Sequence, residues 1–493
     1  MSKLKFILGV AAMAVLVSCG DRSGSIKADQ FLESYVAEHA SVIAYGSFDY
    51  KGIINKSDAQ NIPEFGSFIS QTLDSFTVAF PEDARIYFLI ENADSTDGNP
   101  ADLGVFTIDV KDKKQLMGEF TKMGYSNISE DDEQVLYVND NMLVSIQEKL
   151  AVVFVQEKSF DAPKEFVKTF FEKNKGKSEN DIAGEVLEDG GDIVFCSKPE
   201  SMYAEQVSKA NGVSEAQKSL TMSYIKDAQF KTSVNFKDGE GVITTKAFVN
   251  DKLREALFFN TEGNEAILNQ MGPMDASMGL CVNIDMDKLE KLVKELDPNI
   301  MNKMFSNVDG APMILGVLNT QKFSAFINGK FAVVSSGIAS KSDSIKDISA
   351  YVGLGKGAKG LIDFATSMSD SKDLQKVDEN LYSLSGQALV KQGEDYLLVK
   401  KSSGTKLAEG KVNIPDWADG FGEKPVTGFI DIAAIPESAL VELNLDDTEF
   451  ALDALEWAYF ESDNLESKFV LKAKKGQENI LKQILESFME SRF

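Results

Sequence analysis

The feature that most constrains the fold of this chain is an internal repeat. Residues 40–49 read as an apolar strand that ends at an aspartate, and residues 276–285 have the same form 236 positions later (40 against 276). Both segments begin with Ala-Ser and end with Asp, a residue that commonly caps the first turn of a helix. We therefore expect two strand–cap–helix units, and the helix of the second unit should cover 286–296.

Further matches follow in the same order along the chain. The Pro-Glu-Ser run at Pro199 recurs at Pro436, and the apolar hairpin pattern that follows Tyr137 recurs after Tyr382. Several weak matches in one order are typical of a tandem duplication. The alternative is chance similarity between strand–cap–helix units.

The sequence predicts an α+β fold built from two tandem related halves. A chain of 493 residues exceeds what one hydrophobic core usually organises. We place the boundary within 260–275, which gives a first half over 40–265 and a second half over 266–493. Strand runs and helices are mixed in each half without regular βαβ alternation. Each half is therefore expected to be an antiparallel sheet with helices packed mainly on one face.

The N-terminus has the pattern of a lipoprotein signal peptide. Lys3 and Lys5 precede an uncharged apolar run over 6–17, which is too short for a membrane-spanning helix of about 20 residues. The run leads into Leu-Val-Ser-Cys, which resembles the lipobox read by lipoprotein signal peptidase. Residues 1–18 are therefore predicted to be removed, and Cys19 to carry the acyl chains that bind the bilayer. An ordinary signal peptide or an uncleaved anchor is the alternative.

Residues 19–39 are predicted to form a lipid-anchored tether, because residues 20–30 are mostly small and polar. Its last part has apolar residues at helical spacing and is expected to be partly helical. Gly20 and Asp21 follow the cysteine. They match neither the inner-membrane retention signal of enterobacteria nor the surface-export signal of Bacteroidota lipoproteins. We expect the outer membrane, with the periplasmic face favoured over the cell surface.

The charge of the chain excludes one large class of partner. The formal net charge is −26, so the molecule repels nucleic acid and anionic headgroups. The 43% hydrophobic content argues for folded domains. We expect no nucleic-acid partner, and we interpret the acidity as a means of solubility, with a basic partner or a divalent cation as the alternative.

The residues that usually carry chemistry are scarce. His39 is the single histidine, whereas catalytic triads and zinc sites need histidine as base or ligand. We expect His39 at the surface, and we predict no catalytic, metal-binding or cofactor-binding residue. Cys196 and Cys281 lie in apolar strand-like runs, and two buried free thiols are favoured over a disulfide.

Two short patterns have a functional and a structural interpretation. Residues 353–360 contain G-x-G-x-x-G, but a dinucleotide site needs a strand before the glycines. The preceding 343–351 has a helical pattern, so a flexible loop is predicted. Trp417 and Trp457 are interpreted as packed rings, with stacking on a sugar as the alternative.

Two further patterns concern modification and ions. Ser95 and Ser344 follow aspartates in the context of O-glycosylated Bacteroidota proteins and are candidate glycosylation sites. The acidic runs 130–133 and 446–447 lack the glycine-centred calcium loop and are interpreted as solvated turns.

Together, the lipobox, the strand over 40–49 and the repeated strand–Asp–helix units resemble the large envelope lipoprotein families of Bacteroidota that have no assigned function. The resemblance implies a membrane-anchored envelope lipoprotein and supplies no catalytic residue. We expect a non-enzymatic binding or scaffolding protein with an envelope protein or glycan as partner. The alternative is an envelope glycan hydrolase that uses paired carboxylates.

Overall fold

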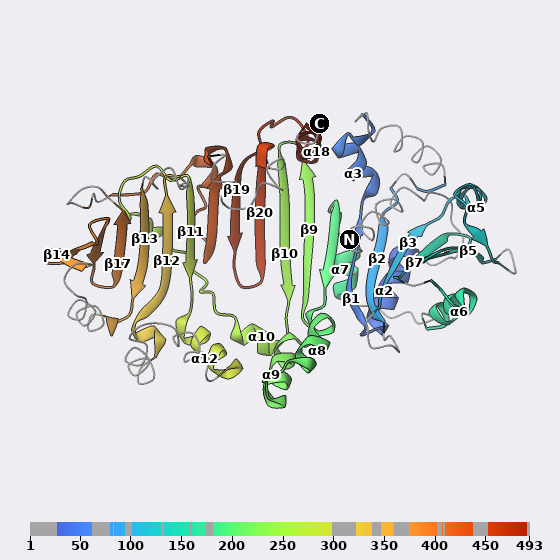
Figure 1. Ribbon diagram of the computed structural model, residues 1–493, viewed down its shortest axis with the longest axis horizontal. Coiled ribbons are helices and arrows are strands. Elements are labelled where there is room, and N and C mark those ends of the chain that lie inside the picture. The colour runs from blue at the N-terminus through green and yellow to red at the C-terminus, as the bar shows by residue number, and fades with distance from the viewer. Residues whose placement is uncertain are drawn as a thin grey trace. The chain divides into compact units, whose positions relative to one another are not determined.

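The fold belongs to the α+β class, as expected, with large antiparallel sheets and several helices (Figure 1). It is known from a computed structural model. The described residues are 27–61, 79–81, 83–93, 101–129, 133–157, 159–173, 181–297, 322–337, 347–358, 374–401, 407, 410–436 and 452–490.

The chain divides into two compact units, which exchange short segments between residues 212 and 249. Unit 1 comprises 1–211, 225–238 and 245–249, and unit 2 comprises 212–224, 239–244 and 250–493.

The strands of unit 1 form an antiparallel sheet in the order β4-β5-β6-β7-β3-β2-β1-β8-β9. The end of β10 also belongs to this unit. The bounds are β1 (Val42–Phe48), β2 (Ile86–Ala93), β3 (Ala101–Asp109), β4 (Ser126–Asn127), β5 (Val135–Asn139), β6 (Met142–Ile146), β7 (Leu150–Val155), β8 (Ile193–Ser197), β9 (Gln229–Lys237) and β10 (Glu240–Phe248).

The strands of unit 2 pair in the order β14-β15-β16-β17-β13-β12-β11-β18-β19-β20, again antiparallel throughout. Each strand number is ten higher than that of the strand in the same place in unit 1. The bounds are β11 (Met278–Asn283), β12 (Ile327–Ser335), β13 (Ile348–Leu354), β14 (Leu374–Asp378), β15 (Leu381–Leu384), β16 (Ala388–Gln392), β17 (Tyr396–Lys401), β18 (Val426–Asp431), β19 (Leu455–Ser462) and β20 (Glu466–Ala473).

Two helices that follow the first strands of their units begin at an aspartate cap. Asp49 accepts a hydrogen bond from the Gly52 amide (2.8 Å) at the start of α3, and Asp285 accepts one from the Lys288 amide (3.0 Å) at the start of α12. The strand–cap–helix units expected at 40–49 and 276–285 are thus observed. The helices are α2 (Ala28–Glu38), α3 (Tyr50–Ser57), α5 (Lys113–Lys122), α6 (Pro163–Lys173), α7 (Asp181–Leu187), α8 (Pro199–Lys209), α9 (Glu215–Ile225), α10 (Asp251–Ala256), α11 (Glu265–Leu268), α12 (Met286–Leu296) and α18 (Ile480–Glu490), with short 3-10 turns η1 (Ala59–Asn61), η2 (Phe323–Ala325), η3 (Asp416–Ala418) and η4 (Ile432–Ala434).

Both faces of the unit 1 sheet are covered, so the prediction of helices mainly on one face is wrong for this unit. Helices α2, α6 and α7 pack on the face that carries Leu89 and Val105. Helix α5 packs on the opposite face, through Leu116 and Phe120, against Phe106. Because successive side chains of a strand alternate between faces, the apolar residues of β3 supply both cores.

The tether prediction extends too far, because residues 28–38 form α2. Phe31, Leu32 and Tyr35 of this helix lie in the hydrophobic core of unit 1. Their helical spacing puts them on one face, and burial of that face outweighs the polar character of the residues between them. A tether can therefore occupy only the positions before α2.

The helix predicted over 343–351 is also wrong, because β13 begins at Ile348. Buried and partly buried residues alternate along β13, which is the period of a strand. The glycine-rich run therefore follows a strand. However, β13 lies between two antiparallel neighbours, β12 and β17, whereas a dinucleotide fold needs a parallel sheet.

Candidate functional site

One face of the unit 2 sheet carries the hydrophobic core of that unit. Cys281 of β11 pairs with Ala332 of β12, which pairs with Tyr351 of β13, and all three side chains are buried in one cluster. Residues of α11 and of the segment 410–421 complete this core. The core therefore fixes which residues of each strand point the other way.

The opposite face of the same strands is aliphatic. Directly paired residues of antiparallel strands share a face. The residues next to Cys281, Ala332 and Tyr351 along their strands therefore lie side by side on the opposite face, in rows that run across the strands. One row pairs Leu280 with Val333 and Ala350, and the next pairs Val282 with Phe331 and Val352. We call these six residues the apolar face.

The rows continue on both sides of the apolar face. Ala350 pairs with Val399 of β17, and Val352 pairs with Leu397. On the other side, Leu280 pairs with Gly428 of β18, and Val282 pairs with Val426. The solvated face of an antiparallel sheet is normally polar, so two rows without a charged or polar side chain across five strands require an explanation.

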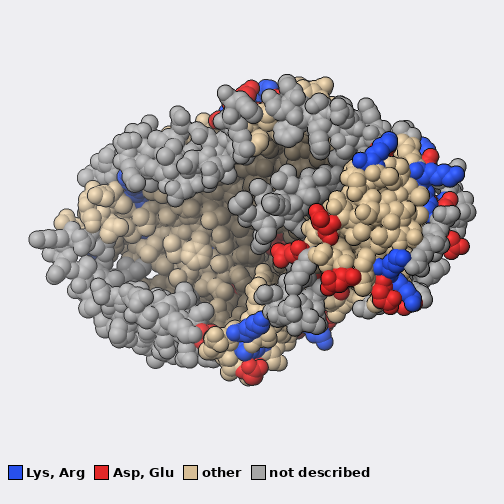
Figure 2. Space-filling model, turned by 45° about the vertical axis from the view of Figure 1, so that its right-hand side comes forward, with Lys and Arg blue, Asp and Glu red and all other residues tan. Residues whose placement is uncertain are grey.

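The apolar face is accessible. Leu280, near its centre, is 45% exposed, and the five other residues are partly exposed. None of the six belongs to a core cluster of the described residues. In Figure 2, tan, uncharged residues form the described wall of a hollow. A group of partly exposed apolar residues on one sheet face is a candidate interaction site.

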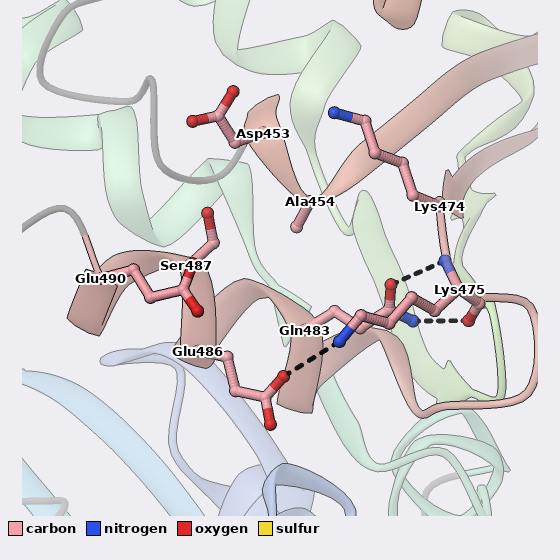
Figure 3. Close-up of a pocket in the computed structure, with 8 residues that line it drawn as sticks. All are labelled: Asp453, Ala454, Lys474, Lys475, Gln483, Glu486, Ser487 and Glu490. Carbon is pink, nitrogen blue, oxygen red and sulfur yellow. Dashed lines mark hydrogen bonds and ion pairs between the residues drawn. The ribbon is translucent and has the colours of Figure 1, made fainter.

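A second feature of unit 2 is a cavity of about 340 Å³ beside α18, which we call the α18 pocket. Glu486, Ser487 and Glu490 extend from α18, whereas Asp453 lies two residues before β19 and Lys474 directly follows β20 (Figure 3). The carboxylates outnumber the lysines in this lining, so the pocket favours a cation or a polar neutral ligand over an anion.

The wall of the α18 pocket is fixed by Gln483, whose side chain is buried. Its amide oxygen accepts a hydrogen bond from the Lys475 amide (3.0 Å), and its Nε2 donates to the carbonyls of Lys475 (2.7 Å) and Glu478 (2.9 Å). Lys475 Nζ lies 3.5 Å from a Glu486 carboxylate oxygen. These bonds attach the turn after β20 to α18 and set the spacing of the pocket.

A third feature is a cavity of about 340 Å³ between α10 and α12, lined by Lys252, Lys288 and Lys291 together with apolar and acidic residues. Lys252 Nζ donates to Ser223 Oγ (2.6 Å) and lies 4.5 Å from the ring centre of Tyr224. Lys288 and Lys291 are exposed surface residues of α12. This cavity therefore offers a positive rim and no buried charged group.

Several of the residues that the sequence analysis named as candidate sites lie outside the part of the chain that the structure describes. Cys19, Ser95 and Ser344 lie outside the described residues. Cys196 and Cys281 are free and buried. Burial raises the pKa of the Cys196 thiol to about 11 and that of the Cys281 thiol to about 12, so both stay protonated at neutral pH and are poor nucleophiles.

The other residues singled out serve packing. His39 ends α2 and stacks on Tyr35 with 3.9 Å between ring centres. Trp417 and Trp457 stack on each other at 4.6 Å with an angle of 5° between their planes. Because Trp417 also contacts the Phe429 ring edge-on, the pair closes the rim of the unit 2 core, and the packing interpretation accounts for both rings.

The glycine-rich run is explained by close backbone approach. A Cβ at Gly355 would lie 2.3 Å from the carbonyl oxygen of Ser324, beside η2, and one at Gly353 would lie 1.9 Å from Asn328 Oδ1. Glycine is thus needed for packing at Gly355, where the close atoms are backbone, whereas at Gly353 the Asn328 side chain would have to move. Residues 359 and 360 and the acidic run 446–447 lie outside the described residues.

Within the described parts of the chain, no cluster of three or more His, Cys, Asp or Glu side chains could hold a metal ion. No helix there is long and apolar enough to span a membrane.

Sequence reasoning missed the apolar face. Its signal is present in β11 and β12, where apolar residues occupy both alternating positions. Such a run is also typical of a strand buried on both sides, and the sequence pattern does not distinguish the two.

Comparison with known proteins adds little. No family model matches the chain, and no curated protein matches it. Among solved structures, crystal forms III, IV and I of TP0453 match with 8%, 8% and 10% identity. They cover 47%, 45% and 47% of this chain and 85%, 81% and 84% of TP0453, with TM-scores of 0.28, 0.28 and 0.27. At these TM-scores we draw no argument from the match.

Proposed function

We propose that this chain is a lipid-anchored envelope lipoprotein of the resembled Bacteroidota type, which binds an apolar ligand or partner and catalyses no reaction. The observation that carries the binding role is the apolar face. Its six residues offer no general acid, base or nucleophile, and they offer no hydrogen-bond donor to a reacting group. Such a surface can bind by excluding water, but it cannot perform acid–base chemistry.

The proposed anchor is Cys19, at the periplasmic face of the outer membrane. Ala28, the first residue of α2, lies nine residues after Cys19, a separation of at most ~30 Å in an extended chain. The α2 start is attached to β3, because the Ala28 amide donates to Asp109 Oδ1 (3.0 Å) and Thr107 Oγ1 donates to the Ala28 carbonyl (3.3 Å). A short tether on a docked helix would hold unit 1 close to the bilayer.

We further propose that the chain arose by tandem duplication. The sequence matches at 40–49 and 276–285 fall on β1 and β11, which occupy the same place in their sheets. Tyr137 and Tyr382 likewise lie in β5 and β15. The shared strand order and the shared sequence positions both support this origin.

The anchor is tested by feeding cells an alkyne-tagged palmitate and comparing the wild type with Cys19→Ala and Cys196→Ala. We expect label on the wild type and on Cys196→Ala, and none on Cys19→Ala. Cys196 is a matched control because its thiol is buried. Retention of label by Cys19→Ala would exclude the anchor.

The binding role is tested on the purified mature protein with a dye that fluoresces on apolar surfaces. We expect Leu280→Lys to reduce the dye signal strongly, because a lysine would place a charge on the apolar face. Met202→Lys on α8 should leave the signal unchanged, since Met202 is comparably exposed (39%) but lies in unit 1. Equal signals from both variants would contradict the proposal.

A second candidate function is an envelope glycan hydrolase. The observation that favours it is the α18 pocket, in which Asp453, Glu486 and Glu490 line one cavity. Glycoside hydrolysis commonly needs two such carboxyl groups. Release of reducing ends from purified envelope glycan, abolished in Asp453→Asn and Glu490→Gln, would establish it. No release by the wild type would leave the binding role.

A further inference from the structure

The sequence contains two Asn-Gly pairs, a dipeptide whose asparagine can lose its side-chain amide without an enzyme. They are Asn211–Gly212 and Asn328–Gly329. In this reaction the backbone nitrogen of the glycine attacks Cγ of the asparagine, and the approach is easy because glycine has no Cβ. Since the reacting atoms are the same in both pairs, the fold decides which of the two reacts.

The first pair is open to solvent. Asn211 and Gly212 form the turn that follows α8, and both residues are exposed. No hydrogen bond to another described residue holds the Asn211 side chain or the Gly212 amide. A Cβ at Gly212 would meet no atom within 4 Å, so the space beside this residue is empty. Water can therefore reach the amide proton that must leave before the nitrogen attacks.

The second pair is held by its surroundings in β12. Asn328 Oδ1 accepts a hydrogen bond from the Lys330 amide (3.1 Å), and its Nδ2 donates to the Leu354 carbonyl (3.3 Å). Gly329 is buried, and its carbonyl accepts from the Ile284 amide (2.9 Å). A Cβ at Gly329 would lie 1.8 Å from the Ile284 carbonyl oxygen, so the backbone here is closely packed.

These contacts set the difference in rate between the two pairs. The reaction at Asn328 requires its carboxamide to rotate toward the Gly329 nitrogen, and this rotation breaks both side-chain hydrogen bonds. Each such bond stabilises the folded arrangement modestly, and the loss of two slows the reaction at least about tenfold. The Asn211 side chain has no such bond to break within the described residues.

We propose that Asn211 is a site of spontaneous deamidation and that the fold protects Asn328. The Gly212 amide gives its proton to water or hydroxide, and its nitrogen forms a bond to Asn211 Cγ. The bond from Cγ to Nδ2 breaks, and Nδ2 takes up a proton and leaves as ammonia. Water then opens the cyclic imide at either carbonyl, which yields aspartate or isoaspartate. This inference does not rest on the proposed function.

The product changes the turn in two ways. Both forms add a negative charge directly after Ala210, the residue that ends α8, where the partial negative charge of the helix C-terminus disfavours an anion. The isoaspartate form also lengthens the backbone by one carbon atom, because the chain then runs through the former side chain. The turn is therefore altered in both charge and geometry.

The test compares both pairs in the same molecule. The full chain is purified in detergent and kept at neutral or mildly alkaline pH. It is then digested in acid, and its peptides are analysed by mass spectrometry with fragmentation that separates aspartate from isoaspartate. We expect conversion at Asn211, faster at the higher pH because the amide must lose a proton, and at least about tenfold slower conversion at Asn328. In denaturant both pairs should convert at similar rates, because the fold no longer protects Asn328.

Two variants assign the reaction to its atoms. Asn211→Gln makes the attack close a larger ring and should abolish conversion at this peptide. Gly212→Ala places a methyl group beside the attacking nitrogen and should slow it. Gly212 has a φ of +76°, which alanine adopts only with strain, so the glutamine variant provides the assignment that leaves the backbone unchanged. Equal rates at the two pairs in the native protein, no conversion at Asn211, or conversion that persists in Asn211→Gln would each overturn the proposal.

Discussion

Substitutions at two adjacent valines of β12 would show which face of the unit 2 sheet is accessible to solvent. Val334 is 1% exposed and belongs to the core cluster of unit 2, whereas Val333 points to the apolar face. Replacing either one by threonine keeps the shape and the preference for a strand, and exchanges one methyl group for a hydroxyl group. The two variants therefore differ only in where the hydroxyl group is placed.

The expected magnitudes follow from burial. In Val334→Thr the hydroxyl lies among apolar residues, and an unsatisfied buried polar group costs about 2 kcal/mol. In Val333→Thr the hydroxyl reaches solvent, and the cost is at most about 0.5 kcal/mol. For a unit of this size, 2 kcal/mol corresponds to a decrease in Tm of roughly 4–8 °C.

Unfolding is followed by tryptophan fluorescence, because the only two tryptophans, Trp417 and Trp457, both lie at the rim of the unit 2 core. We expect a clear loss of stability for Val334→Thr and almost none for Val333→Thr. Equal losses would show that both faces of β12 are buried, and the apolar face would then be an ordinary second core.

Three further predictions concern unit 1. Asp192 is 4% exposed and accepts hydrogen bonds from Lys56 Nζ (2.5 Å) and the Phe236 amide (2.6 Å). Asp192→Ala should therefore cost about 3 kcal/mol in chemical denaturation followed by circular dichroism, and Asp192→Asn clearly less, because the amide oxygen still accepts. Burial raises the pKa of Asp109, so the folded state binds this proton more tightly than the unfolded chain, and stability falls as pH rises through the raised pKa. Asp109→Asn should flatten that decline in unfolding curves measured from about pH 4 to pH 8. An unchanged slope would contradict this reasoning. Gly46→Ala would place a Cβ 2.0 Å from the Val194 carbonyl oxygen, so we expect a loss of about 3 kcal/mol by thermal unfolding, and a neutral variant would mean that β1 and β8 separate without strain.

The local elements were predictable where a polar residue interrupts an apolar run. Asp49 and Asp285 cap helices as expected because the aspartate ends an apolar strand and its carboxylate meets free amides of the first turn. Helix α12 was predicted from the spacing of its leucines, and the observed helix has the expected bounds 286–296. In these segments the local chemistry and the tertiary structure favour the same conformation.

The prediction failed where both faces of a strand are apolar. Over 348–353 the sequence Ile-Ser-Ala-Tyr-Val-Gly has no strict polar alternation, so its apolar residues also fit a helical spacing. Pairing of β13 with β12 and β17 decides for a strand, and this pairing involves residues far away in the chain. The candidate site was hidden for the same reason, since accessibility of Leu280 is a property of the assembled sheet.

The two sheets share a strand order, and among the described residues the corresponding face is seen covered in unit 1, whereas the segment after β13 in unit 2, 359–373, lies outside those residues. In unit 1, Phe106 of β3 packs beneath Leu116 and Phe120 of α5. In unit 2, Ala350 and Val352 of β13, the strand in the same place, belong to no core cluster of the described residues. If both halves descend from one ancestor, selection for stability alone would favour a covered face in each, because burial of aliphatic surface stabilises the fold. Leu280 of the apolar face is 45% exposed, so this side chain forgoes part of that stabilisation, and binding of an apolar ligand would restore it.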